Sequence, residues 1–137
     1  MDKIVVLDFG GQYAHLIANK IRRFGVYTEI KDPDVSAEEL RDYKGIVLSG
    51  GPSSVNASES VSCDPGIFDL GIPVLGICYG HQVIAHQLGG KIEKGQVREY
   101  GRAHVKFSGD EGLLAGLNSS EEVWMNHFDQ VVAVPPG

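Results

Sequence analysis

Residues 73–82, PVLGICYGHQ, are the most informative part of the sequence for the fold. Within it, Gly76 and Gly80 flank Cys78, so the pattern is G-x-C-x-G. An apolar, strand-like run precedes the pattern, and a helix-forming segment follows it. This is the context of a nucleophile on a sharp strand-to-helix turn, where crowding requires small neighbours. The stretch therefore predicts a strand, a tight turn that presents the Cys78 thiol, and a helix.

The same alternation of strand and helix extends toward the N-terminus. The expected elements are a strand at Lys3–Leu7, a helix with the apolar face Ala14, Ile17, Ala18 and Ile21, a strand at Val26–Lys31, a short helix from the capping box Ser36–Glu39 to about Asp42, a strand at Gly45–Ser49, a short helix at Pro65–Leu70, a strand at Pro73–Ile77 and a helix at Tyr79–Leu88. This alternation predicts an α/β fold: a doubly wound, mostly parallel sheet with helices on both faces.

After Gly90 the pattern changes to short strand-like pieces with turns between them. They are Lys91–Glu93, His104–Phe107, Val123–Met125 and Val131–Val134, and they predict a small antiparallel extension. The sequence closes on a Pro-Pro-Gly turn at 135–137, whereas a doubly wound domain normally continues with a further strand and helix. We therefore expect one domain, residues 1–137, that is incomplete at its C-terminus.

Composition and charge narrow the class of protein. The 137 residues are enough for one domain with a single core. Twelve basic against eighteen acidic residues give a net charge of −6, which offers no electrostatic reason to bind nucleic acid. No run approaches the ~18 apolar residues of a membrane-spanning helix. Two cysteines, Cys63 and Cys78, make a poor disulfide framework, so a reducing cytoplasm is the expected compartment.

The turn at Cys78 has the features of a thiol nucleophile. The N-terminus of the following helix favours the thiolate and directs the Tyr79 N–H toward an oxyanion formed there. The loop Ser49-Gly50-Gly51-Pro52 follows another strand, and a glycine in it allows a second N–H to approach the reacting carbonyl. The competing interpretations are a small buried cysteine and a simple Gly-Gly-Pro turn. Neither glycine cluster matches a phosphate-binding motif.

Three stretches resemble the class I, or triad, glutamine amidotransferases. They are DFGGQY at 8–13, LSGGPS at 48–53 and the elbow at 73–82. In detail they are similar to the amidotransferase domains of GMP synthases, as are EYG at 99–101 and VWMNHFD at 123–129. The similarity covers essentially the whole chain.

The resemblance implies a role for each of these motifs. Cys78 attacks the side-chain amide of glutamine, releases ammonia and leaves a glutamyl thioester. Gly51 and Tyr79 supply the oxyanion N–H groups. The implied glutamine-binding residues are Gly50, Gln82, Asn126, His127 and Phe128, of which Phe128 departs from the glycine found in many relatives.

The resemblance also implies a partner. Ammonia passes to an ATP-pyrophosphatase (synthetase) domain or subunit, which uses ATP and Mg²⁺ to convert XMP to GMP. The amidotransferase domain itself carries no cofactor and no metal in this family. Arg98, Glu99 and Arg102 are candidates for the interface with that partner, although exposed loop charges are more often simply solvated.

The family completes its triad with a His-x-Glu pair, and no such pair occurs in residues 1–137. None of the five histidines is assigned as the base; they are His15, His81, His86, His104 and His127. We therefore expect this chain alone to bind glutamine poorly and to hydrolyse it slowly or not at all. Ammonia release from a chain extended by ~50 residues, about a strand–helix unit and the triad loop, tests this, and equal activity would contradict it.

Three other functions stay open. The acceptor could belong to anthranilate or carbamoyl-phosphate synthesis, the fold could serve as a non-catalytic glutamine-sensing module, or the cysteine could hydrolyse peptides or glutamyl conjugates. Of the remaining residues, Cys63 is expected to be a free loop thiol without a role, and Trp124 a core residue.

Overall fold

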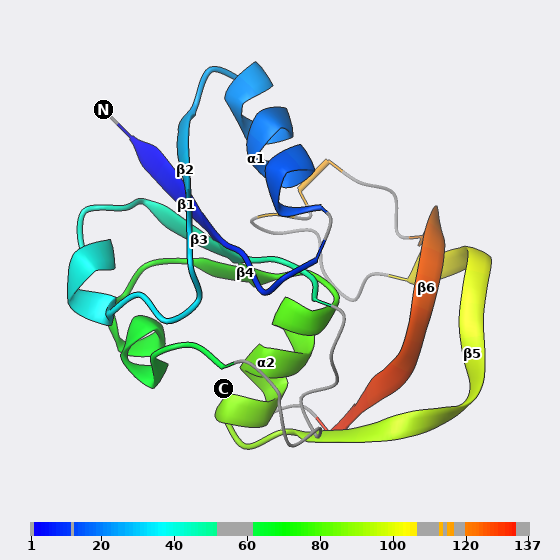
Figure 1. The fold of residues 1–137 in the computed structure, drawn as a ribbon. Helices are drawn as coiled ribbons and strands as arrows, with labels where there is room; N and C mark the ends of the chain where they lie inside the picture. The colour runs from blue at the N-terminus through cyan, green and yellow to red at the C-terminus, as the bar shows by residue number, and fades with distance from the viewer. Residues whose placement is uncertain are drawn as a thin grey trace. The chain divides into compact units, whose positions relative to one another are not determined.

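The structure, a computed structural model, describes residues 2–11, 13–51, 62–106, 113, 115–116 and 120–133 (Figure 1). The chain divides into two compact units. The first comprises residues 1–93 with 131–137, and the second comprises residues 94–130.

Four parallel strands form the sheet of the first unit, in the order β2-β1-β3-β4. They are β1 (Lys3–Leu7), β2 (Tyr27–Lys31), β3 (Gly45–Leu48) and β4 (Val74–Gly76). From β1 the chain continues to β2 on one side of the sheet, and it then crosses to β3 and β4 on the other side of β1. The topological switch point therefore lies between β1 and β3. Open α/β sheets bind ligands at the carboxyl ends of the strands at this point.

Helices cover both faces of the sheet, as the sequence predicted. On one face α1 (Ala14–Arg23) packs through Ala14 and Ala18 against Val6 and Val47. On the other face lie η1 (Ala37–Leu40), η2 (Pro65–Asp69) and α2 (Tyr79–Gln87). These three elements pack against the alternate strand residues, which are Val5, Leu7, Ile46 and Leu48.

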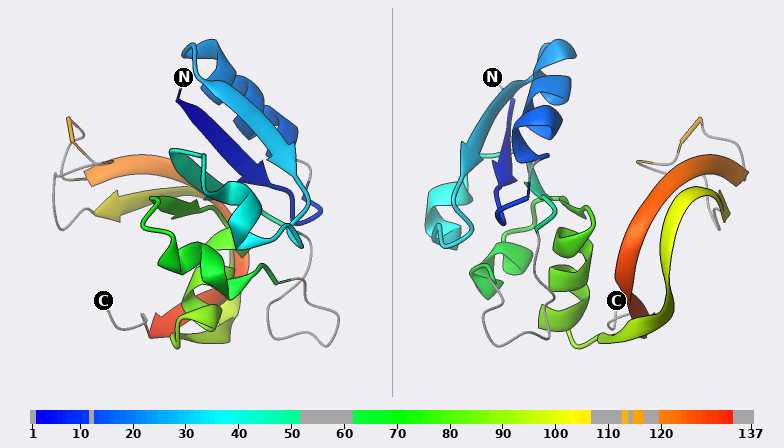
Figure 2. Two further views of the ribbon diagram at one scale, coloured as in Figure 1. Left: turned by 90° about the vertical axis from the view of Figure 1, so that its left-hand side faces the viewer. Right: turned by 45° about the vertical axis from the view of Figure 1, so that its right-hand side comes forward.

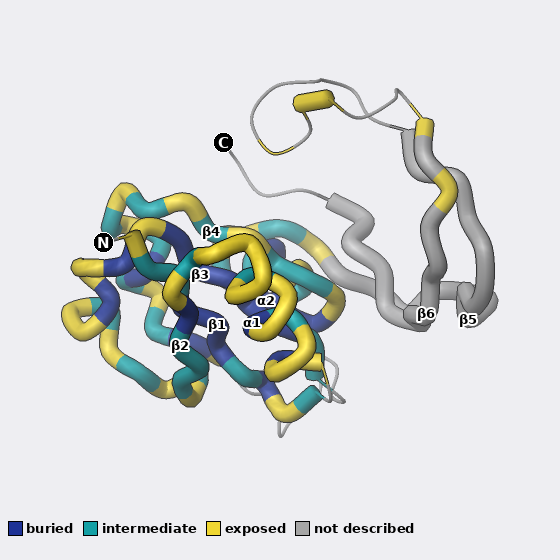
Figure 3. The backbone as a smooth tube through the Cα atoms, turned by 90° about the horizontal axis from the view of Figure 1, so that it is seen from above, coloured by how far each residue is buried: buried dark blue, intermediate teal, exposed yellow. Residues whose placement is uncertain are grey.

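Burial is concentrated in the two central strands. All four residues of β3 are buried, as are the last three of β1 (Figure 3). Strands covered on both faces read as continuous apolar runs, which is why these two segments were identifiable. Each fully buried Val, Leu or Ile side chain stabilises the fold by roughly 1.5–3 kcal/mol.

The predicted capping box at Ser36 is wrong. Ser36 is the N-cap residue of η1, but its side chain accepts no hydrogen bond there. Instead Asp64, which is 27 residues further along the chain, accepts a 2.8 Å bond from the Ala37 N–H. The element is a 3₁₀ turn that ends at Leu40, shorter than the predicted helix. A tertiary carboxylate thus replaces the local cap.

The extension after Gly90 is also simpler than predicted. Instead of four short pieces, β5 (Lys91–Lys106) and β6 (Ser120–Ala133) are two long strands that pair with each other. They run in opposite directions, as expected, and both curve strongly (Figure 2). Gly95 and Gly101 lie within β5, where glycines mark bends and not only turns.

Candidate active site

Cys78 lies at the turn from β4 into α2 and is the N-cap residue of that helix. Its backbone has φ 54° and ψ −115°, and it is the one non-glycine residue with positive φ among those the structure describes. Such a conformation costs about 1–3 kcal/mol and persists only where the surrounding structure imposes it. The predicted nucleophile elbow is therefore present, and its side chain is exposed.

The two glycines of the pattern are required by packing. A Cβ on Gly80 would lie 2.1 Å from the Leu48 carbonyl oxygen, and one on Gly76 would lie 2.7 Å from the His81 nitrogen. No side chain fits at either position. The two glycines therefore allow α2 to begin in direct contact with β3. This close packing fixes the position of the Cys78 sulfur at the start of the helix.

The loop after β3 lies against the elbow. The Ile77 N–H donates a 2.9 Å bond to the Leu48 carbonyl oxygen, which joins the end of β4 to the end of β3. A Cβ on Gly50 would lie 3.4 Å from the Cβ of Cys78, so the bare backbone of Gly50 faces the cysteine. The sheet thus brings Gly50 and Cys78 together. The sequence alone showed only that each belongs to a glycine-containing motif after a strand.

The loop after β1 completes this edge. The Gly11 N–H donates a 3.2 Å bond to the Gly50 carbonyl oxygen. A Cβ on Gly51 would lie 2.6 Å from the Phe9 carbonyl oxygen, so the two loops touch backbone to backbone. The Phe9 ring packs against the Tyr79 ring, with centroids 5.5 Å apart. Sequence reasoning gave Phe9 no role, although its motif was recognised.

This arrangement can stabilise a tetrahedral oxyanion. Tyr79 is the first residue of α2, and helix N-termini carry partial positive charge from their N–H groups. The glycine loop beside Cys78 leaves room for a carbonyl group to approach the backbone. A thiol between a helix N-terminus and an open backbone loop is suited to acyl transfer.

The second cysteine has the opposite environment. Cys63 is 5% exposed, and burial raises the pKa of its thiol to about 11. The Gln87 side chain accepts a bond from the Cys63 N–H (3.2 Å) and donates one to its carbonyl oxygen (3.1 Å). A buried, protonated thiol is inert. The predicted free thiol is confirmed, but the residue belongs to the core and is not an idle loop position.

The other predicted residues fall into two groups. Gln82 is half-buried in the first turn of α2, where its N–H donates to the Cys78 carbonyl oxygen (3.2 Å). The remaining glutamine-binding candidates lie in the part of β6 that belongs to the second unit, and their side chains are outside the described residues; they are Asn126, His127 and Phe128. Of the histidines, His15, His81 and His86 are exposed on helices, and His104 lies on β5.

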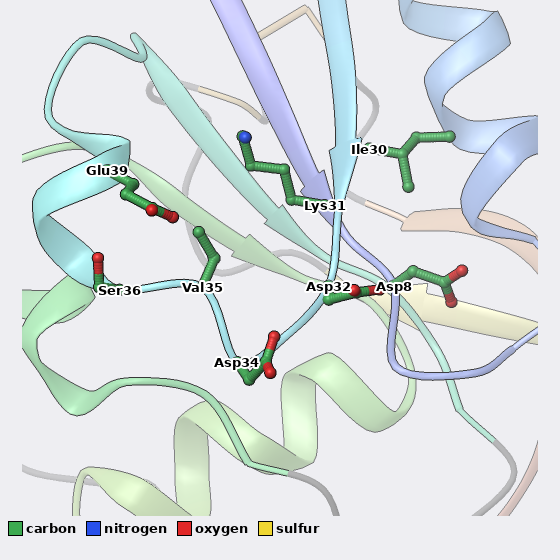
Figure 4. Close-up of a pocket in the computed structure, with 8 residues that line it drawn as sticks. All are labelled: Asp8, Ile30, Lys31, Asp32, Asp34, Val35, Ser36 and Glu39. Atoms are coloured by element: carbon green, nitrogen blue, oxygen red, sulfur yellow. The ribbon is translucent and has the colours of Figure 1, made fainter.

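A hollow of about 610 Å³ lies at the ends of β1 and β2 (Figure 4). Its charged lining consists of Lys31 and four carboxylates, from Asp8, Asp32, Asp34 and Glu39. The residues that line it include neither cysteine nor histidine, so it lacks the groups of the proposed cysteine chemistry. Within the described residues, no group of three His, Cys, Asp or Glu could hold a metal ion. None of the helices described is long and apolar enough to cross a membrane.

Comparison with known proteins defines the class. The family model "Glutamine amidotransferase class-I" matches residues 5–137. The chain therefore belongs to the class-I glutamine amidotransferase family. The Cys78 elbow and the glycine loop that faces it lie within the matched region.

Two curated relatives of this chain carry the same description. A protein of Geobacillus kaustophilus (strain HTA426) described as GMP synthase (glutamine-hydrolyzing) is 52% identical over 99% of this chain. A protein of Bacillus subtilis (strain 168) with the same description is 51% identical over 99% of the chain. The chain spans about a quarter, 27%, of the length of each.

Solved structures agree with the fold. A protein from Thermoplasma acidophilum, described as a putative GMP synthase subunit, is 36% identical, with a TM-score of 0.86 over 98% of this chain and 69% of that one. A glutamine amidotransferase from Thermotoga maritima has a TM-score of 0.72 at 22% identity, over 94% of this chain and 61% of that one. The second likeness concerns the fold alone.

Proposed function

We propose that this chain is the glutamine-hydrolysing amidotransferase part of a GMP synthase, with Cys78 as its nucleophile. The observation that carries the proposal is the strained, glycine-flanked elbow that presents the exposed Cys78 thiol beside the Gly50 backbone. Strain of this kind in a residue outside glycine is concentrated at functional sites.

The chemistry begins with attack of the Cys78 thiolate on the side-chain amide carbon of glutamine. The carbonyl electron pair moves to oxygen, and the N–H groups of Gly51 and Tyr79 stabilise the resulting oxyanion. When the intermediate collapses, the C–N bond breaks and the nitrogen takes a proton to leave as ammonia. Water then hydrolyses the γ-glutamyl thioester, which releases glutamate and restores the thiol. The net reaction is glutamine plus water to glutamate plus ammonia.

For glutamine recognition, the proposal carries over the residues that the resemblance to the family implies. Gly50 and Gln82 flank Cys78 in the sheet unit, and Asn126, His127 and Phe128 are expected to hold the α-amino and α-carboxylate groups. The general base belongs to a His-x-Glu pair in this family, and residues 1–137 contain none. The histidines of this chain are not assigned that role.

The acceptor of the ammonia is proposed from the names of the relatives. Both curated relatives are described as GMP synthases, which favours XMP over the acceptors of anthranilate or carbamoyl-phosphate synthesis. The remaining three quarters of those relatives have room for an ATP- and Mg²⁺-dependent synthetase domain, to which the ammonia passes. Such an enzyme of nucleotide synthesis is expected in the cytoplasm.

Labelling of the complete protein with 6-diazo-5-oxo-L-norleucine, an electrophilic glutamine analogue, tests the nucleophile and the substrate together. We expect a covalent adduct on the Cys78 peptide, found by mass spectrometry, and protection by glutamine but not by asparagine. The Cys63 peptide of the same sample is the internal control and stays unmodified, because that thiol is buried with a raised pKa. An absent adduct, or equal labelling of the two cysteines, would contradict the proposal.

A further inference from the structure

Ser49 is a fully buried polar residue at the carboxyl end of the central sheet, directly before the Gly50–Gly51 loop. Its hydroxyl donates a 2.8 Å hydrogen bond to the Leu7 carbonyl oxygen and accepts a 3.4 Å bond from the Phe9 N–H. Both partners belong to the end of β1 and the loop after it. The hydroxyl therefore links the loop after β1 to the start of the loop after β3, across the switch point.

Phe9 continues this link to the nucleophile elbow. It is 4% exposed, and its ring packs against the Tyr79 ring at a tilt of 56°. Its carbonyl oxygen and Cβ occupy the space where any side chain at Gly51 would have to lie, 2.6 Å and 3.2 Å from the position of such a Cβ. Phe9 thus touches the residues on both sides of the reacting thiol.

The hydroxyl is not needed to pair the strands. The Ser49 N–H itself donates a 3.1 Å bond to the Leu7 carbonyl oxygen, as expected between parallel neighbours. Loss of the hydroxyl would leave that bond in place and would remove the acceptor of the Phe9 N–H. The hydroxyl also lies 3.4 Å from the Gly50 carbonyl oxygen, a longer contact than its bond to Leu7. Its chemical effect therefore falls on the positions of Phe9 and Gly50, and through them on Gly51 and Tyr79.

We propose that Ser49 and Phe9 are positioning residues, which together set the separation between the backbone N–H groups of Gly51 and Tyr79. The inference rests on the proposed function, in which those two groups stabilise the oxyanion. Backbone donors act through fixed geometry, so a small displacement weakens them in the transition state more than it weakens substrate binding. Neither side chain contacts the substrate in this mechanism.

The test compares Ser49→Ala with a matched loss of a buried hydroxyl elsewhere. Thr28 is 4% exposed on β2 and its hydroxyl donates to the Val26 carbonyl oxygen (3.0 Å), so Thr28→Val removes a similar hydrogen bond far from the elbow in sheet order. Glutamate release from glutamine is measured in the complete protein, together with alkylation of Cys78 by iodoacetamide. The alkylation forms no carbonyl oxyanion.

We expect Ser49→Ala to lower kcat by about 10- to 100-fold, less than the loss of a whole oxyanion donor. KM should change by less than about threefold, because ground-state contacts are retained. Alkylation of Cys78 should stay within about twofold of the parent rate, since that reaction does not use the two N–H groups. Phe9→Leu, which removes the ring contact with Tyr79 and keeps the backbone, should lower kcat in the same manner.

A purely structural role would give a different result. In that case Ser49→Ala would resemble Thr28→Val in kcat, or would lower glutamine turnover and alkylation in parallel, and either outcome overturns the inference. If Ser49→Ala does not fold, Phe9→Leu decides by the same criteria. A parent protein that releases no glutamate refutes the proposed function itself, and this outcome is distinct from an active parent with an unaffected Ser49→Ala variant.

Discussion

Replacement of a residue by glycine usually lowers the stability of a fold, but the strained backbone at Cys78 predicts the opposite effect there. Cys78→Gly should make the protein more stable, although it removes the proposed nucleophile. The backbone at this position has φ 54° and ψ −115°, which a side chain disfavours and glycine adopts freely. Since the Cys78 side chain is exposed, its removal sacrifices little packing.

The expected size follows from two opposing effects. Relief of the strain contributes about 1–3 kcal/mol to the free energy of unfolding. Glycine loses more backbone entropy on folding, which subtracts about 0.5–1 kcal/mol. The net gain is about 1 kcal/mol, equivalent to a rise in Tm of roughly 3–5 °C for a chain of this size.

Thermal and urea unfolding of Cys78→Gly and Cys78→Ala measure this effect. The alanine variant is the control, because it also lacks the sulfur but keeps a Cβ and hence the strain. We expect the glycine variant to unfold at the higher temperature and at the higher urea concentration. If it unfolds at or below the midpoint of the alanine variant, the elbow is not under strain and the reasoning fails.

Three further predictions concern the surroundings of the elbow. Gly80→Ala should destabilise the fold by more than about 3 kcal/mol, because its Cβ would lie 2.1 Å from the Leu48 carbonyl oxygen; urea unfolding measures this. Hydrogen bonds from two backbone N–H groups, those of Ala37 and Gly66, hold the pKa of the Asp64 carboxyl below its ordinary value of about 3.9. The stabilising effect of Asp64 should therefore be present above that pH and disappear as the pH falls through the lowered pKa. Acid unfolding of Asp64→Ala should accordingly show a weaker pH dependence than that of the parent protein. Gln87→Ala should expose the Cys63 thiol, and native-state alkylation of that thiol at pH about 8 should become faster.

Each of these predictions has a control within the chain. Gly25 has φ +80° and no atom within 4 Å of an added Cβ, so Gly25→Ala should cost only about 1 kcal/mol. Asp69 is exposed, and Asp69→Ala should keep the parent acid profile. Exposed His86, next to Gln87, should tolerate alanine without faster alkylation of Cys63. Equal behaviour of a variant and its control would contradict the corresponding prediction.

Elements that rely on local patterns could be predicted from the amino-acid sequence. Apolar runs marked β1 and β3 because strands covered on both faces carry few polar residues. Helix ends were marked by Gly25 and Gly89, both of which adopt positive φ. The G-x-C-x-G pattern identified the elbow because no side chain fits at its two glycines.

The tertiary structure alone decided which distant groups meet. It placed Gly50 against Cys78, joined Ser49 to Phe9, and replaced the local Ser36 cap with the Asp64 carboxylate. None of these contacts has a sequence signal, because the residues that they join lie 27 to 40 positions apart and no local periodicity connects them. The hydrogen bonds that organise the site are therefore set by strand order, whereas the reactive turn itself is set by a few neighbouring residues.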